Sequence, residues 1–82
     1  MRAAVEISMY PLTPDYRPPI QAFIDRLNTY PGLTVRTNAL ATQIWGELDH
    51  IMKLLTQEMT RSAGDAAQLV FVIKVLPGLA PP

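Results

Sequence analysis

The sequence contains no cysteine and a single histidine, His50. Without cysteine the chain cannot form a disulfide, and it lacks the thiolates and multiple imidazoles that hold structural zinc. One histidine also leaves the serine and threonine hydroxyls without the partner set that nucleophilic catalysis requires. The four glycines are isolated, so no glycine-rich phosphate-binding motif is present. We therefore expect no catalytic residues, no metal site and no cofactor, and we expect that the protein is not an enzyme.

Charge is sparse and balanced. Seven Lys and Arg oppose seven Asp and Glu, which gives a formal net charge of zero. The basic residues are scattered from Arg2 to Lys74 with no two adjacent, and this pattern argues against a surface that follows a phosphate backbone. We therefore expect no nucleic-acid partner.

Long apolar runs are also missing. The longest, residues 69–73, is far shorter than the roughly 20 residues that a membrane-spanning helix needs. Glu6 interrupts the apolar stretch after Arg2, so no signal-peptide pattern is present. We expect no membrane insertion and a cytoplasmic location.

The length of 82 residues predicts a single domain over residues 1–82. A domain of this size buries only roughly 60% of its unfolded surface, so its stability is marginal. Since disulfides and metals are excluded, oligomerisation is the remaining common way to bury more surface. A hydrophobic content of 49% is compatible with such an assembly.

Apolar periodicity and turn signals divide the chain into alternating strands and helices. The predicted elements are a strand over 3–10, a helix from Pro18-Pro19 to Pro31-Gly32, strands over 33–38 and 42–47, a helix from about Leu48 to Gly64-Asp65, and a strand over 68–76. The order β-α-β-β-α-β predicts an α+β fold, the ferredoxin-like sandwich. In this fold a four-stranded antiparallel sheet of order 4-1-3-2 carries two helices on one face.

The second helix and the last strand supply further predicted core positions. The expected apolar stripe of the helix is Leu48, Ile51, Met52, Leu55 and Met59. In the last strand, alternate residues should face the helices: Leu69, Phe71, Ile73 and Val75.

The other face of the sheet is predicted to be partly apolar. Val70 and Val72 should lie on it, and so should Trp45, which is out of phase with the core residue Ile44. An indole and two valines exposed together on a monomer would form an apolar patch that promotes association with another molecule. We therefore expect a homo-oligomer, a dimer or a tetramer, that packs sheet to sheet.

The same face is predicted to carry polar groups beside aromatic rings. Glu6 and Ser8 share it with Tyr10, and Glu47 shares it with Trp45. Aromatic walls with a few polar groups are typical of a small-molecule site. A second interpretation is that Glu6 and Glu47 are solvated at the margin of the sheet. If Glu6 is instead central and structural, it should pair with a cation such as Arg36 or Lys74.

One enzymatic alternative on this fold is the hydrolysis of acyl phosphates, which uses an arginine in the loop after the first strand and an asparagine. Arg17 and Asn38 are present by type. The loop after the first strand is rich in proline and lacks the glycine-rich phosphate cradle, so this activity rests on fold analogy alone.

An ordered set of segments resembles a known family. The run Glu6-Ile-Ser-Met-Tyr-Pro-Leu12, continued by Asp15-Tyr16 and Pro19-Ile20, resembles the first strand, loop and helix start of the YkoF-like thiamine-binding proteins. The segments Leu33-Thr-Val-Arg-Thr-Asn38 and Thr42-Gln-Ile-Trp-Gly-Glu47, followed by Leu48-Asp49-His-Ile-Met52, look like the central hairpin and second helix of that family. The match covers roughly residues 4–76. Some members carry two such domains, whereas this chain has one.

The resemblance implies a ferredoxin-like fold that associates through its sheets and binds thiamine (vitamin B1) or its hydroxymethylpyrimidine half without catalysis. It also implies a link to thiamine uptake or homeostasis. A pyrimidine offers a stacking face, ring nitrogens and an exocyclic amine, which suit aromatic rings and carboxylate acceptors. The candidate ligand-binding residues are Glu6, Ser8, Tyr10, Asn38, Thr42, Trp45 and Glu47. A second hypothesis is a structural or regulatory ferredoxin-like oligomer that senses another small metabolite.

Overall fold

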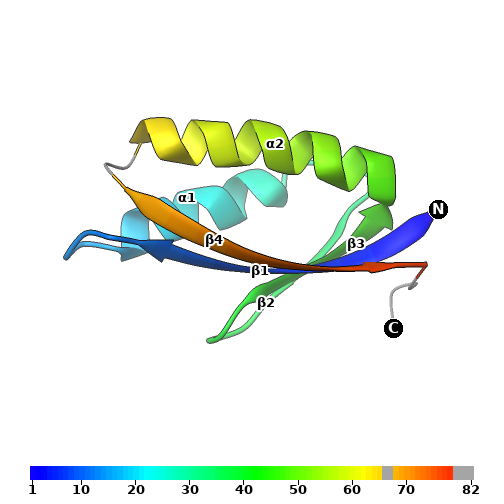
Figure 1. Cartoon of the computed structure of the whole chain (residues 1–82), viewed down its shortest axis with the longest axis horizontal. Helices are drawn as coiled ribbons and strands as arrows, with labels where there is room; N and C mark the ends of the chain where they lie inside the picture. The colour runs from blue at the N-terminus through cyan, green and yellow to red at the C-terminus, as the bar shows by residue number, and fades with distance from the viewer. Residues whose placement is uncertain (66–67, 79–82) are drawn as a thin grey trace.

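The computed structural model describes residues 1–65 and 68–78. It contains the six predicted elements in the predicted order: β1 (Arg2–Pro11), α1 (Arg17–Leu27), β2 (Thr34–Thr37), β3 (Thr42–Glu47), α2 (Leu48–Asp65) and β4 (Leu69–Pro77). The strands form one antiparallel sheet of order β2-β3-β1-β4, and both helices cover the same face (Figure 1). The ferredoxin-like fold and its strand order are confirmed.

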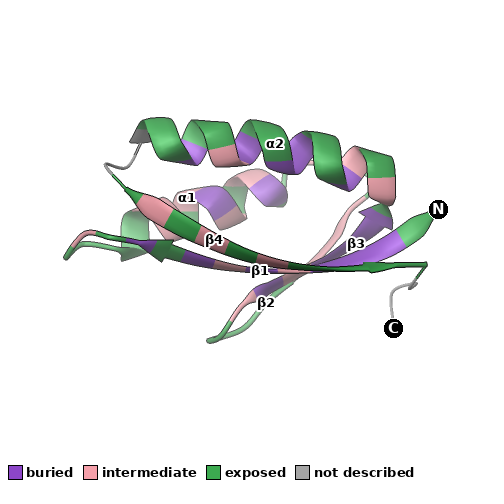
Figure 2. Cartoon of the chain, in the orientation of Figure 1, coloured by how far each residue is buried: buried purple, intermediate pink, exposed green. Residues whose placement is uncertain are grey.

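The core lies between this sheet and the two helices (Figure 2). Alternate residues of β1 enter it because the strand period is two, and they meet the apolar stripes of the helices. The most deeply buried core residues are Val5, Ile7, Phe23, Leu27, Ile44, Ile51, Leu54 and Leu55. From β4, Leu69, Phe71 and Ile73 pack against this core as predicted, whereas Val75 is 37% exposed.

The buried stripe of α2 differs from the predicted one. Met52 is 46% exposed, while Leu54 is buried. Glu58 and Ser62 continue the buried stripe toward the end of the helix, with exposures of 3% and 2%. The apolar pattern alone missed these two positions because their side chains are polar.

A polar network makes the burial of Glu58 possible. Its carboxylate accepts hydrogen bonds from Arg26 Nε and, at 2.9 Å, from the Tyr30 hydroxyl. Arg26 Nη2 also donates to Ser62 Oγ at 2.9 Å. A buried carboxylate is stable only when it is paired and hydrogen-bonded. The network therefore fixes α1 and the turn after it against α2.

Within the described residues, no helix has the length and apolar character needed to cross a bilayer.

Tyr30 provides a test of this network. Its hydrogen bond to Glu58 raises the pKa of the phenol above the usual 10.0, and burial and the charge of Glu58 act in the same direction. Because the pKa is raised in the folded state, this stabilisation is fully present below pH 10 and is lost as the pH rises through the folded pKa. We expect Tyr30→Phe to cost about 1 kcal/mol at pH 8 and to flatten the fall in stability above pH 10.

Urea unfolding from pH 8 to pH 11, together with phenolate absorbance, measures both effects. Parallel stability curves for the two proteins above pH 10 would show that the Tyr30–Glu58 hydrogen bond does not form in solution.

Candidate functional site

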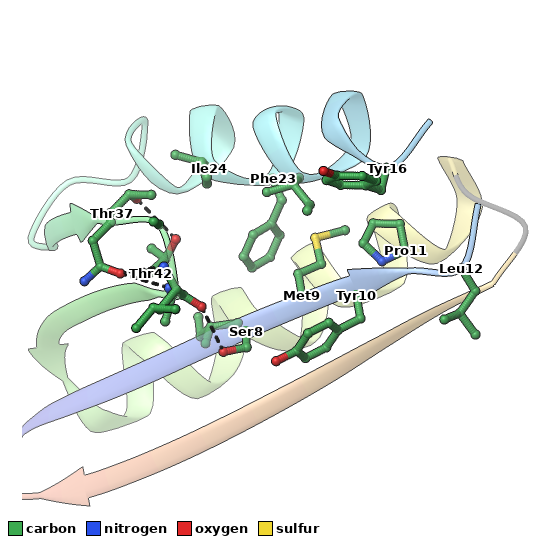
Figure 3. Close-up of a pocket in the computed structure, with 16 residues that line it drawn as sticks. Ser8, Met9, Tyr10, Pro11, Leu12, Tyr16, Phe23, Ile24, Thr37 and Thr42 are labelled. Atoms are coloured by element: carbon green, nitrogen blue, oxygen red, sulfur yellow. Dashed lines mark hydrogen bonds between the residues drawn. The ribbon is translucent and has the colours of Figure 1, made fainter. Parts of the chain in front are cut away.

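A pocket opens where β1 extends past the start of β3. The β1–β3 ladder ends at the pair Ile7–Thr42, whereas the β1–β4 ladder continues to the pair Pro11–Leu69. The hairpin loop between β2 and β3 and the helix α1 surround the uncovered end of β1 (Figure 3). The cavity has a volume of about 450 Å³, which lies in the usual range for small-molecule sites.

One wall of the pocket is apolar. It is formed by Met9 of β1 and Phe23 of α1, whose side chains point toward one another (Figure 3). Phe23 also packs on Phe71 of β4, with 5.4 Å between the ring centroids. Ile20 and Ile24 of α1 complete this wall. Among the described residues that line the pocket, none carries a charged side chain.

The opposite wall is polar and comes from the hairpin. Asn38 Oδ1 accepts hydrogen bonds from the N–H groups of Leu40, at 2.8 Å, and Ala41, at 3.1 Å. This Asx-type turn shapes the loop. The Thr42 hydroxyl lies 3.2 Å from the Thr37 hydroxyl.

Two tyrosines line the pocket from opposite sides of β1 and remain open to solvent: Tyr16 lies on the α1 side and Tyr10 on the other (Figure 3). Tyr10 is 53% exposed and Tyr16 is 49% exposed. Rings that are half exposed present a face to an entering ligand, either for stacking or for contact with a cation.

Four of the predicted ligand-binding residues therefore meet in this pocket: Ser8, Tyr10, Asn38 and Thr42. The apolar wall of Met9, Ile20, Phe23 and Ile24 was not among the predicted site residues. The spacing of these side chains indicated core positions, and spacing does not reveal where the core opens to solvent.

The two predicted carboxylates lie outside the pocket lining. Glu6 is half-buried on the open face, where Lys74 Nζ lies 3.7 Å and Gln43 Nε2 lies 3.5 Å from its oxygens. This arrangement matches the interpretation in which Glu6 pairs with a cation. Glu47 lies opposite Arg2, which is about 17 Å along β1 from Ile7, the nearest pocket residue of that strand, by strand rise.

Glu47 interacts instead with the beginning of the chain. The N-terminal ammonium lies 3.0 Å from its carboxylate, and Arg2 Nη1 lies 3.7 Å away. The hydrogen bond from the ammonium lowers the pKa of Glu47, and the two positive charges act in the same direction.

Trp45 also lies outside the pocket lining. It pairs with Ala4 and Thr34, which places it on the open face as predicted. The prediction that it is exposed in a monomer is wrong, because only 7% of it is accessible within a single chain. The Arg36 guanidinium covers its ring, with 5.6 Å between the guanidinium carbon and the ring centroid.

The arginine and asparagine that acyl phosphate hydrolysis would use do not meet in this pocket. Arg17 is exposed and does not line it, although Asn38 does.

A ring nitrogen of His50, the single histidine, lies 3.1 Å from the carbonyl oxygen of Pro31. In the described part of the chain, no group of three or more histidine, aspartate or glutamate side chains is placed to hold a metal ion.

Comparison with known proteins places the chain in a family. Residues 2–75 match the YkoF-related family. This chain belongs to that family. The comparison with curated proteins found no match.

Solved structures share the fold. A protein of Streptococcus pneumoniae has a TM-score of 0.88 and 23% identity, with 96% of this chain and 89% of that chain covered. A Thermotoga maritima protein, described as having a proposed role in thiamine biosynthesis or salvage, has a TM-score of 0.85 and 18% identity over 93% and 83%. A Methanocaldococcus jannascii protein has a TM-score of 0.82 and 24% identity over 99% and 84%.

The hairpin wall gives a test of what shapes the site. Asn38→Asp keeps the oxygen that accepts the two N–H groups, so we expect the stability to change little. Asn38→Ala removes that acceptor, and we expect a loss of about 1 kcal/mol, because the turn loses two hydrogen bonds whose exposed N–H groups can bond to water instead. Urea unfolding of the two variants measures the difference. Equal losses in both would show that the side chain does not hold the turn.

Proposed function

We propose that this protein binds hydroxymethylpyrimidine, free or as part of thiamine, in the pocket beside the end of β1, and that it does so without catalysis. The observation that carries the proposal is a pocket with one apolar and one polar wall, whose described lining residues carry no charged side chain. A neutral aromatic heterocycle with polar edges fits such walls. Membership of the YkoF-related family and the thiamine link of the Thermotoga maritima relative support the same ligand.

The absence of charge in the described pocket lining also bears on competing ligands. An amino acid carries an ammonium and a carboxylate, and each needs a charged or hydrogen-bonding partner when it leaves water. A neutral pyrimidine needs hydrogen-bonding partners for its ring nitrogens and amine, but it needs no opposite charge. For thiamine, we propose that the pyrimidine enters the pocket and that the cationic thiazolium remains near Tyr16, which lies on the same side of β1 as Met9 and Phe23 (Figure 3).

Calorimetric titration tests this function, with hydroxymethylpyrimidine, thiamine and an amino-acid mixture as ligands. We expect Thr42→Val to weaken hydroxymethylpyrimidine binding about tenfold or more, because it puts a methyl group in place of a hydroxyl on the pocket wall. At a hundred times its dissociation constant, the pyrimidine should stabilise the fold by about 2.7 kcal/mol.

Thr34→Val is the matched control. Thr34 is also a strand threonine, but it lies opposite Trp45 at the other end of the sheet. Its substitution should leave the affinity unchanged. The proposed function would be refuted if the wild-type protein bound neither the pyrimidine nor thiamine. Binding of an amino acid alone would favour a sensor of another metabolite.

We further propose that the protein works as a homo-oligomer that packs through the open face of the sheet. Val70 and Val72 are 45% and 49% exposed there. A polar row crosses the same face, formed by Arg36, Gln43, Glu6 and Lys74 in register. A two-fold partner would cover the exposed valines, and their burial favours assembly.

Light scattering tests the assembly. We expect Val72→Lys to shift the protein toward the monomer, because it places a charge in the proposed interface. Met52→Lys is the matched control, since Met52 is 46% exposed on the helical layer. A monomeric wild-type protein at micromolar concentration would contradict the proposal, as would equal effects of the two substitutions.

A further inference from the structure

The backbone N–H and C=O groups of β1 form hydrogen bonds alternately with β4 on one side and with β3 on the other. On the β4 side, the N–H of Leu12 bonds to the carbonyl of Gln68 at 2.9 Å. On the β3 side, the carbonyl of Met1 accepts from the N–H of Leu48 at 2.9 Å. In an antiparallel sheet the backbone groups of successive residues point alternately toward the two neighbouring strands. The N–H and C=O groups of odd-numbered β1 residues therefore point toward β3. The N–H and C=O of Met9 therefore point toward the β3 side.

The strand β3 does not extend as far as Met9. Continued register would place Leu40 opposite it, but Leu40 lies in the hairpin loop. The N–H of Leu40 bonds to Asn38 Oδ1 at 2.8 Å, and its carbonyl accepts from Ser8 Oγ at 3.5 Å. The hairpin thus uses the groups that would otherwise complete the ladder, and the pocket occupies the position beside Met9.

This position is sheltered. Met9 is 8% exposed and lines the pocket (Figure 3). Buried backbone N–H and C=O groups require hydrogen-bond partners, from protein, water or ligand. The side-by-side donor and acceptor of a single residue thus face a cavity with no charged side chain among its described lining residues.

We propose that the backbone of Met9 recognises the ligand through a ring nitrogen next to an exocyclic amine, the edge that an aminopyrimidine presents. The Met9 N–H donates to the ring nitrogen, and the amine donates to the Met9 carbonyl. The ligand thereby takes the place of the residue that β3 does not supply. This inference rests on the proposed function and adds the chemical feature that the pocket selects.

The proposal explains how a pocket without charge can be selective. A site built to hydrogen-bond a donor–acceptor edge rejects analogues that lack the edge, because its own buried groups then lose their partners. Cytosine presents the same edge but lacks the ring methyl and hydroxymethyl groups, so the apolar wall should favour hydroxymethylpyrimidine over it.

Nuclear magnetic resonance gives the direct test. With the chain and hydroxymethylpyrimidine both labelled with ¹⁵N, we expect a scalar coupling between the Met9 nitrogen and a ring nitrogen, and hydrogen exchange at the Met9 amide slowed at least about tenfold. The amide of Ile7 is the internal control, because it lies in the β1–β3 ladder and should not change. Binding detected at Asn38 and Thr42 without coupling to Met9 overturns this inference and leaves the proposed function intact. No binding at any residue overturns both.

An ester analogue at Met9, in which oxygen replaces the N–H, gives an independent test. Because this N–H lies outside the ladder, the analogue should fold, and its affinity for hydroxymethylpyrimidine should fall about tenfold or more. The pyrimidine without its amine should bind the normal chain more weakly by a similar factor. Cytosine should bind more weakly than hydroxymethylpyrimidine. Unchanged affinity of the ester, or of the pyrimidine without the amine, overturns the proposal.

Discussion

The site depends on the unequal lengths of the two ladders that flank β1. On one side the strand is paired as far as Pro11, and on the other only as far as Ile7. If both ladders had the same length, every peptide group of β1 would be paired with a neighbouring strand. The inequality exposes the last residues of the central strand to a cavity, while β4 still holds them in an extended conformation. A recognition surface made of backbone is therefore rigid before any ligand arrives.

The two helices stabilise the pocket by fixing the position of α1, which forms one of its walls. Phe23 contributes both to the core and to the pocket wall, so the packing that stabilises the fold also positions the site. The network of Arg26, Tyr30, Glu58 and Ser62 holds α1 against α2. A shift of α1 would change the width of the pocket, and the buried network resists such a shift because it would leave Glu58 unpaired.

The open face of the sheet carries the proposed interface between subunits. Its charges are already paired in part, as Glu6 is with Lys74, and its indole is covered by Arg36. The exposed apolar area on this face then comes mainly from β4. The proposed interface adjoins the pocket along β1, because Val72 pairs with Ser8 and Val70 pairs with Tyr10, and both partners line the pocket.

The sequence alone determined the element order and most of the core, because periods of two and 3.6 and the turn residues are local properties. The strand order followed from the fold that this element order predicts. It also identified Ser8, Tyr10, Asn38 and Thr42, which meet in the pocket. Only the tertiary structure decided that Glu6, Trp45 and Glu47 lie elsewhere, since residues on one face can be far apart along a strand. The covering of Trp45 by Arg36 and the burial of Glu58 depend on partners that are distant in sequence. The uncovered backbone of Met9 depends on where a neighbouring strand begins, and no side-chain pattern encodes that point.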